Sequence, residues 1–368
     1  MNIKKIDDYI FELDTYKELD YDIVSQDFDE RIKKWGQGGG CSCIVKTTDA
    51  GETIVGRNMD LTISNKPAYI VRTDCPDKYK TVGISYSHMS GPNYKEVLEN
   101  GISTEHYKML PFLCCDIMNE NGFYVEINMR SGEENPDGSP KFGCTSTKSG
   151  AKYRICSINL PRFLAENCAD VDEAVRYAKN EVDMYTPNIP GLNWNFCFIL
   201  ADKSGKYGLL EIANNKVSWL PGENAQTNFY KTPEFACVED LKCGLGRHEL
   251  LESEIGKVQN TEDMFELMKK VSYSQVYKNN PKYNVLSEYV GVEPNWTIDY
   301  IMDEKNKKEI QNRVDDNIKK FAKKTRQELQ DESKYWESIF TVAANCNLKT
   351  LLVRFFEDDN KVIKLEIH

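Results

Sequence analysis

The 368-residue sequence has few histidines, no excess of positive charge and no long hydrophobic run. A helix that crosses a bilayer needs about 18 or more consecutive apolar residues, and no segment approaches this length. Lys and Arg number 47 against 58 Asp and Glu, which gives a formal net charge of −11. An acidic chain without a basic stripe is poorly suited to the phosphate backbone of nucleic acids. We therefore expect no membrane span and no nucleic-acid partner.

The N-terminus also lacks the basic start and apolar core of an export signal. We therefore expect a cytoplasmic protein in which most of the 12 cysteines are reduced thiols rather than disulfides. The paired Cys-x-x-Cys framework of a zinc site is missing, and the four histidines are scattered at His88, His106, His248 and His368. A metal site is therefore the less favoured interpretation of the cysteine content.

What the sequence does contain is a cysteine directly behind a glycine run. Cys41 follows Gly38-Gly39-Gly40, and two β-branched runs separated by a turn at 48–51 come next, which is typical of a β-hairpin. The hairpin would return Arg57 and Asp60 to the end where Cys41 begins. A guanidinium near a thiol favours the thiolate, and a carboxylate near an α-amine can orient it as a base. The alternative is a small, semi-buried cysteine beside a structural ion pair.

Two segments, Cys41-Ser42-Cys43-Ile44-Val45 and Gly56-Arg57-Asn58-Met59-Asp60, resemble the start of the mature choloylglycine hydrolases. This family includes bile salt hydrolases and penicillin V acylases, and acid ceramidases and N-acylethanolamine acid amidases are related to it. Further matching segments follow in the family's order: Asn119-Glu120-Asn121-Gly122 leading to Asn128, Leu160-Pro161-Arg162-Phe163-Leu164, Leu200-Ala201-Asp202-Lys203-Ser204-Gly205, Gln226-Thr227-Asn228, and Arg247. The resemblance covers nearly everything from Cys41 to the C-terminus.

The resemblance implies an α+β fold, a four-layer αββα sandwich of the N-terminal-nucleophile hydrolase type. The first residue of the mature chain is the catalytic cysteine in this family, so the chain would be cut before Cys41. The α-amine of Cys41 would then take the thiol proton, and the thiolate would attack the amide carbonyl of the substrate. Arg57 would tune the thiolate and Asp60 would orient the amine. No metal or organic cofactor is needed.

The same resemblance assigns three further residues. The side chain of Asn228 would hold the oxyanion, with Asn128 as the weaker candidate because its interval from Gly122 differs from the bile salt hydrolase pattern. Arg247 occupies the position where the family often has an arginine, within a loosely similar segment. Asn228 has a structural alternative, which is to cap a turn before Thr232-Pro233.

We divide the chain into a pro-segment, residues 1–40, and a hydrolase domain, residues 41–368. The pro-segment is expected to be removed by autocleavage and to end in a flexible Gly-rich linker at 36–40. Its apolar spacing predicts an amphipathic helix, with the apolar positions Ile3, Ile6, Ile10 and Leu13. The alternative is an ordinary extension packed on the surface. The hydrolase domain carries a charged helical insertion near 303–334, which offers a contact for a second subunit in a homo-oligomer.

Apolar patterns predict the remaining elements of the domain. Strands are predicted at 43–47, 53–57, 67–72, 122–128, 195–201, 207–213, 216–220, 338–343 and 350–356, and helices at 161–179 and 247–257. The Tyr-rich stretch at 73–118 is a candidate wall of the binding pocket, or equally local core.

We expect an amidohydrolase that cleaves a linear N-acyl amide, a small molecule with a bulky apolar acyl group. Conjugated bile salts are the first candidate because the segment from Ala201 to Gly205 resembles bile salt hydrolases. The segment from Gln226 to Phe229 instead resembles the ceramidase-type relatives, so an N-acylethanolamine, a ceramide or penicillin V is the alternative. Two other hypotheses stay open: an uncut homologue that only binds its ligand, and a Cys–His mechanism that uses His248.

Overall fold

The computed structural model describes residues 2–15, 39–62, 67–86, 113–131, 142–186, 194–235, 243–279, 284–289, 300, 303–322 and 324–368. Within these ranges the chain forms two large sheets, in which β2 and β5 are parallel and the other neighbouring strands are antiparallel. The nine-stranded sheet has the order β1 (Asn2–Asp7), β2 (Ile10–Thr15), β5 (Ala68–Thr73), β6 (Thr81–Tyr86), β7 (Asp116–Asn119), β8 (Tyr124–Ser131), β11 (Trp194–Ala201), β12 (Tyr207–Ala213) and β13 (Lys216–Pro221).

The six-stranded sheet contains the hairpin that begins near Cys41 and returns to Asp60. Its order is β14 (Ala225–Gln226), β3 (Gly39–Thr47), β4 (Thr53–Thr62), β15 (Trp336–Asn345), β16 (Thr350–Phe355) and β17 (Val362–Glu366). A separate two-stranded sheet pairs β9 (Tyr153–Cys156) with β10 (Val182–Tyr185). The strands predicted at 338–343 and 350–356 are confirmed as β15 and β16, and the chain closes with a further strand, β17, that was not predicted.

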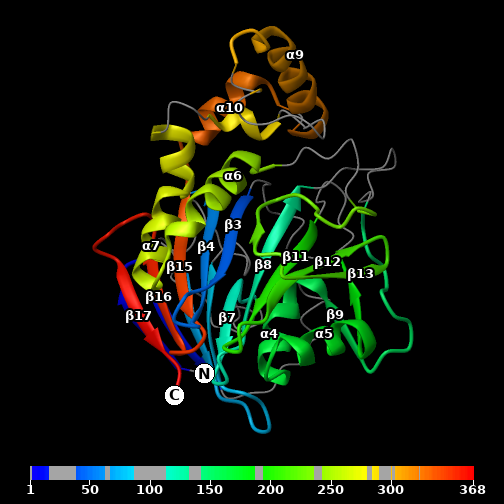
Figure 1. Cartoon of the computed structure of the whole chain (residues 1–368), viewed down its shortest axis with the longest axis vertical. Coiled ribbons are helices and arrows are strands. Elements are labelled where there is room, and N and C mark those ends of the chain that lie inside the picture. Colours follow the sequence, from blue (N-terminus) through cyan, green and yellow to red (C-terminus); the bar gives the residue numbers. More distant parts are fainter. Residues whose placement is uncertain are drawn as a thin grey trace.

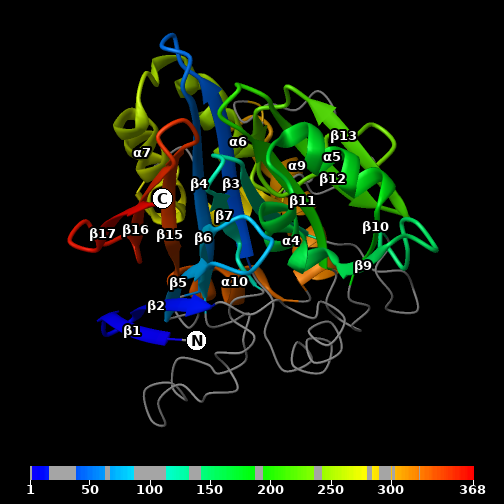
Figure 2. The same cartoon turned by 90° about the horizontal axis from the view of Figure 1, so that it is seen from below.

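Helices cover the outer face of each large sheet (Figures 1 and 2). α4 (Leu160–Asn167) packs on β7 and β8, and α5 (Val171–Asn180) lies beside it. On the opposite side, α7 (Thr261–Lys270) packs on β4 and β15, and α6 (Leu245–Glu254) packs on β3 and β14. The order of layers is helix, sheet, sheet, helix, which confirms the predicted four-layer αββα sandwich.

The antiparallel register of β3 and β4 sorts their side chains onto two faces, because successive side chains of a strand point to opposite sides. Cys41 pairs with Met59 and Cys43 with Arg57, on the face toward the nine-stranded sheet. Gly40 pairs with Asp60 on the other face, toward the helices. At the open end of the hairpin, one face therefore carries Cys41 and Arg57, and the other face carries Asp60.

The predicted N-terminal helix is wrong. Residues 2–15 form the β1–β2 hairpin, and β2 extends the nine-stranded sheet by pairing in parallel with β5. Ile10 and Leu13 are buried in the main core, whereas Ile3 and Ile6 are 38% and 39% exposed. Long-range pairing of the strand outweighed the helical spacing of these apolar residues. Most of the predicted linker, residues 36–38, lies outside the described residues, and Gly39 and Gly40 belong to β3.

The predicted helix at 161–179 is two helices, since the chain breaks at Cys168–Asp170. The side chain of Asp170 caps α5 by accepting a hydrogen bond from the Glu173 N–H at 2.9 Å. The prediction at 247–257 matches α6 together with the short helix η5 (Ile255–Lys257).

The charged insertion consists of α9 (Lys307–Asn317), the π-helical turn η8 (Ile318–Ala322) and α10 (Arg326–Ser333). Figure 1 shows these helices beyond the end of the sandwich, next to α6. Their apolar side chains join one cluster with two preceding turns, the π-helical η6 (Ser274–Asn279) and the 3₁₀-helical η7 (Val285–Tyr289). Another short helix in the described part of the chain is η4 (Ser157–Asn159).

Candidate active site

Cys41 lies at the beginning of β3 and is 2% exposed. Its Sγ is 3.6 Å from Arg57 Nη2 and 3.8 Å from Met59 Sδ. Burial raises the pKa of the thiol to about 11, although Arg57 and a backbone hydrogen bond from Met129 act in the opposite direction. In the intact chain the thiol is therefore neutral near pH 7, and it needs a base before it can act as a nucleophile.

Arg57 is fully buried within β4. Its Nε lies 3.2 Å from Asp116 Oδ2 and 3.6 Å from Glu126 Oε2. Its Nη2 donates a hydrogen bond to the Ile127 carbonyl at 2.9 Å. A buried guanidinium between two carboxylates keeps its charge, so it stabilises any negative charge that forms on Cys41.

Asp116 and Glu126 are carboxylates that the sequence analysis did not select. They sit opposite each other on β7 and β8, and both are fully buried. Burial raises the pKa of Glu126 to about 8, against the attraction of Arg57, and burial also raises the pKa of Asp116. Tyr124 donates a short hydrogen bond to Asp116. The sequence signal for these two residues was a charged side chain inside each of two otherwise apolar strands. The contact of both carboxylates with Arg57 follows only from the pairing of the strands.

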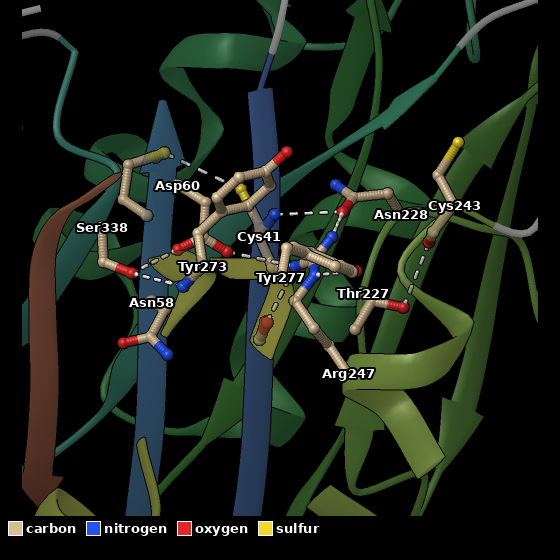
Figure 3. Close-up of polar contacts among 12 residues, drawn as sticks. Cys41, Asn58, Asp60, Thr227, Asn228, Cys243, Arg247, Tyr273, Tyr277 and Ser338 are labelled. Atoms are coloured by element: carbon tan, nitrogen blue, oxygen red, sulfur yellow. Dashed lines mark hydrogen bonds and ion pairs between the residues drawn. The ribbon is translucent and has the colours of Figure 1, made fainter. Parts of the chain in front are cut away.

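Arg247 is the second fully buried arginine of the site, and it reaches the hairpin from α6 (Figure 3). Its Nη1 donates to the Cys41 carbonyl at 2.5 Å and to the Ser42 hydroxyl at 2.8 Å. The same nitrogen lies 3.2 Å from Asp60 Oδ2. Its Nη2 donates to Asn228 Oδ1 at 2.9 Å. The guanidinium thus fixes the main chain of Cys41 to two of the other predicted residues.

Asp60 lies on the helix-facing side of β4, opposite Gly40. Besides Arg247, it accepts a hydrogen bond from the Ser338 hydroxyl at 2.5 Å. The two partners hold the carboxylate beside the peptide bond between Gly40 and Cys41.

Asn228 bridges the two sheets through both ends of its side-chain amide. Its Oδ1 accepts a hydrogen bond from the Cys41 N–H at 3.0 Å, and its Nδ2 donates to the Met129 carbonyl. The side chain therefore holds the nitrogen that a cut before Cys41 would turn into an amine. Asn128 is linked to the site through Glu126, because its Nδ2 donates to Glu126 Oε1 at 3.3 Å and Glu126 contacts Arg57. The structure thus brings together Cys41 and the other predicted residues, with Asn128 at the periphery.

His248 follows Arg247 on α6, but its neighbours are Glu252, at 3.5 Å from Nδ1, and the Phe229 ring. These contacts do not support the Cys–His alternative. No group of His, Cys, Asp and Glu suited to a metal ion occurs among the described residues. In the same part of the chain, no helix is long and apolar enough to cross a membrane. The predicted pocket wall at 73–118 lies largely outside the described residues, from 87 to 112.

The sandwich, with a cysteine at the start of a central strand, places the chain in the N-terminal-nucleophile class of folds. The sequence model of the acyl-coenzyme A:6-aminopenicillanic acid acyl-transferase family matches residues 47–285. This range is more than half of the chain, and the chain belongs to that family. The match contains all of the predicted site residues except Cys41, which lies just before it.

Solved structures of related folds resemble the chain at low identity. A variant of conjugated bile acid hydrolase from Clostridium perfringens is 13% identical, with 89% of this chain and 92% of that chain covered and a TM-score of 0.45. Penicillin V acylase from Agrobacterium tumefaciens is 13% identical, with 86% and 83% covered and a TM-score of 0.42. No curated protein matches the sequence.

Proposed function

We propose that the protein is an N-terminal-nucleophile amidohydrolase whose catalytic residue, Cys41, is released by cleavage of the bond between Gly40 and Cys41. The observation that carries the proposal is that the thiol and the main-chain nitrogen of Cys41 contact different sets of residues. The thiol lies against Arg57, between the sheets. The main-chain nitrogen is hydrogen-bonded to Asn228, which Arg247 also holds.

Cleavage supplies the base that the buried thiol needs. An α-amine has a pKa of about 7.7 to 8, so a sizeable fraction is unprotonated near neutral pH and can accept the Sγ proton. The thiolate, next to the Arg57 charge, then forms a bond to the amide carbon of the substrate. The Met129 N–H and Asn228 Nδ2 are the nearest candidate donors for the oxyanion.

The second half of the reaction returns the enzyme to its starting state. When the carbon–nitrogen bond breaks, the leaving amine takes the proton held by the α-amine of Cys41, and an acyl thioester remains. Water adds to the thioester, the free acid leaves and the thiol is regenerated. Asp60 and Arg247 keep the α-amine and the Cys41 carbonyl in place during both steps.

A linear amide with a bulky apolar acyl group is the proposed substrate, with conjugated bile salts first and other N-acyl amides second. Transfer of the acyl group to an amine instead of water is a second candidate, since the matching family is described as an acyl-transferase. Both outcomes share the acyl thioester and differ only in the group that attacks it.

An amide panel tests the proposal. The purified protein is incubated with a glycine-conjugated bile salt, an N-acylethanolamine, a ceramide and penicillin V, each with and without an added amine acceptor. Mass spectrometry is expected to show free acid from at least one substrate, and none with the Cys41→Ala variant. A conjugate that forms faster than free acid would favour acyl transfer. Equal product from both proteins, or none from either, would contradict the proposal.

A further inference from the structure

The turn that follows α7 is a π-helical segment that reaches the catalytic hairpin. It comprises η6 together with the preceding Ser272 and Tyr273. Its two tyrosine rings, Tyr273 and Tyr277, lie 4.7 Å apart at their centroids. Single π-helical turns are uncommon and often occur at functional sites.

One contact of the segment is with Arg247. The Arg247 Nε donates a hydrogen bond to the Tyr277 hydroxyl at 3.1 Å, and its Cζ lies 6.0 Å from the centre of the Tyr277 ring. The other guanidinium nitrogens hold the Cys41 carbonyl and Asn228. Tyr277 therefore contacts the Nε of the guanidinium, while the two terminal nitrogens face Cys41 and Asn228.

The same segment also reaches Asp60, through Ser338. The Tyr273 N–H donates to the Ser338 hydroxyl at 3.2 Å, and that hydroxyl donates to Asp60 Oδ1 at 2.5 Å. Glu357 also connects the turn to Ser338. It accepts hydrogen bonds from the Ser338 N–H at 2.8 Å and from the Ser274 N–H at 3.3 Å. The Ser274 hydroxyl also donates to Glu357.

The backbone that presents Glu357 adopts an unusual conformation. Phe356 has a φ of +56° and Glu357 a φ of +52°, in the left-handed region that side chains disfavour. Residues in such conformations persist where the surrounding structure fixes them, often at functional sites.

We propose that this segment is a positioning element for the Arg247–Asp60 pair, with Tyr277 and Ser338 as positioning residues. The inference rests on the proposed function, because it describes how the groups around the Cys41 nitrogen are held. Neither residue touches the thiol or takes a proton in the reaction. Tyr277 fixes the orientation of Arg247, which contacts Cys41. Ser338 fixes the orientation of Asp60, which lies beside the peptide bond before Cys41.

The helical insertion gives the element its rigidity. Val276 and Tyr277 of the turn belong to the same apolar cluster as Ile310, Val314 and Ile318 of the insertion. Val276 is fully buried and Val314 is 4% exposed. The insertion therefore packs against the turn.

The Tyr277→Phe variant tests the proposal against a matched control, Tyr230→Phe. Both substitutions remove one hydroxyl from a tyrosine that is nearly fully buried, and the Tyr230 hydroxyl donates to the Ile212 carbonyl at 3.1 Å. We expect kcat of Tyr277→Phe to fall about tenfold, with KM nearly unchanged and a loss of thermal stability similar to that of the control. Equal kcat values for the two variants would overturn the positioning role.

A second readout does not depend on amide hydrolysis. Iodoacetamide alkylates Cys41 at a rate set by the thiol's surroundings, and we expect Tyr277→Phe to slow this labelling at least about threefold relative to Tyr230→Phe. If the wild type cleaves no amide and labelling still differs, the proposed function fails and the positioning role stands. If labelling is equal in the two variants, the positioning role fails whatever the substrate is.

The Val314→Ala variant tests the part played by the insertion. It opens a cavity behind η6, and the control Val171→Ala opens a similar one under α5, where Val171 is 2% exposed. We expect Val314→Ala to lower kcat about threefold and to act non-additively with Tyr277→Phe. Additive effects, or an equal loss in the control, would remove the insertion from the positioning element.

Discussion

The two faces of the β3–β4 hairpin each hold a buried arginine, but the two arginines are bonded in different ways. Arg57 lies between the sheets against two carboxylates, and its distance to the thiol is 3.6 Å. Arg247 lies on the helix side, and its shorter hydrogen bonds go to the Cys41 carbonyl, Ser42 and Asn228. We propose that Arg57 acts mainly through its charge and that Arg247 acts mainly through the geometry of its planar fork.

The largest effect is expected from removing the charge between the sheets. Arg57→Ala should lower kcat about 10²-fold or more, because the thiolate loses its counter-charge. It should also lower the free energy of unfolding by about 3 to 5 kcal/mol, because the Asp116 carboxylate is left buried without a cation. Steady-state kinetics and denaturant unfolding measure the two effects. A fully active variant, or one with unchanged stability, would contradict the role given to Arg57.

Lysine substitutions separate charge from geometry. Arg57→Lys keeps a cation near the carboxylates and should retain more activity than Arg57→Ala. Arg247→Lys keeps the charge but loses the fork, so its kcat should fall about 10²-fold. The measurement is kcat for both variants, expressed per folded protein. If Arg57→Lys is the more damaged of the two, the distinction between the arginines is wrong.

A substitution at Gly40 tests whether the position of Arg247 matters. A Cβ at this position would lie 3.0 Å from Arg247 Nη2, so Arg247 would have to shift. We expect Gly40→Ala to slow cleavage of the chain about tenfold. Gly256→Ala is the control, since an added Cβ there has no neighbour within 4 Å. The rate is followed by gel electrophoresis, and equal rates in the two variants would show that cleavage does not need this placement of Arg247.

The smallest effect is a pH dependence of stability. Glu126 has a pKa of about 8 in the folded chain against an ordinary 4.5, since burial disfavours its charge. A raised acid pKa adds stability that is complete below the unfolded pKa and is lost as the pH rises through the folded pKa. Between about pH 5 and pH 9, the Tm of the Cys41→Ala chain should therefore fall more steeply than that of the same chain with Glu126→Gln.

A substitution at an exposed glutamate gives the control for this pH dependence. Glu234 is 71% exposed at its side chain, so Glu234→Gln should leave the slope of Tm against pH unchanged. Parallel slopes for all three chains would mean that Glu126 is already ionised in the folded protein at neutral pH.

The sequence predicted local features of the fold well where the pattern itself determines the structure. The β3–β4 hairpin follows from two β-branched runs and a glycine turn, and the αββα layering follows from the family resemblance. The break before α5 could have been found too, because Asp170 and Glu173 form an Asp-x-x-Glu capping pattern at the helix start.

Features that depend on distant pairing could not be predicted. The helical spacing of Ile3, Ile6 and Ile10 gave no sign that β2 would pair with β5. Likewise, Asp116 and Glu126 lie far from Cys41 in the sequence, and only the order β7–β8 beneath the hairpin brings them to Arg57. For Asn228, the residue was found, but its bond to the Cys41 nitrogen depends on a bridge between two sheets.

Whether Cys41 is an N-terminal nucleophile can be tested by the mass of the purified chain under denaturing conditions, followed by the site of iodoacetamide labelling. Denaturation is needed because β2 is paired with β5 and can hold the first residues on the sheet after a cut. We expect a chain that begins at Cys41 and is labelled first at Cys41, while Cys41→Ala stays full length and Cys43→Ala is cut and labelled like the wild type. A full-length wild-type chain, equal cleavage of Cys41→Ala, or first labelling at Cys43 would contradict the claim that Cys41 is an N-terminal nucleophile.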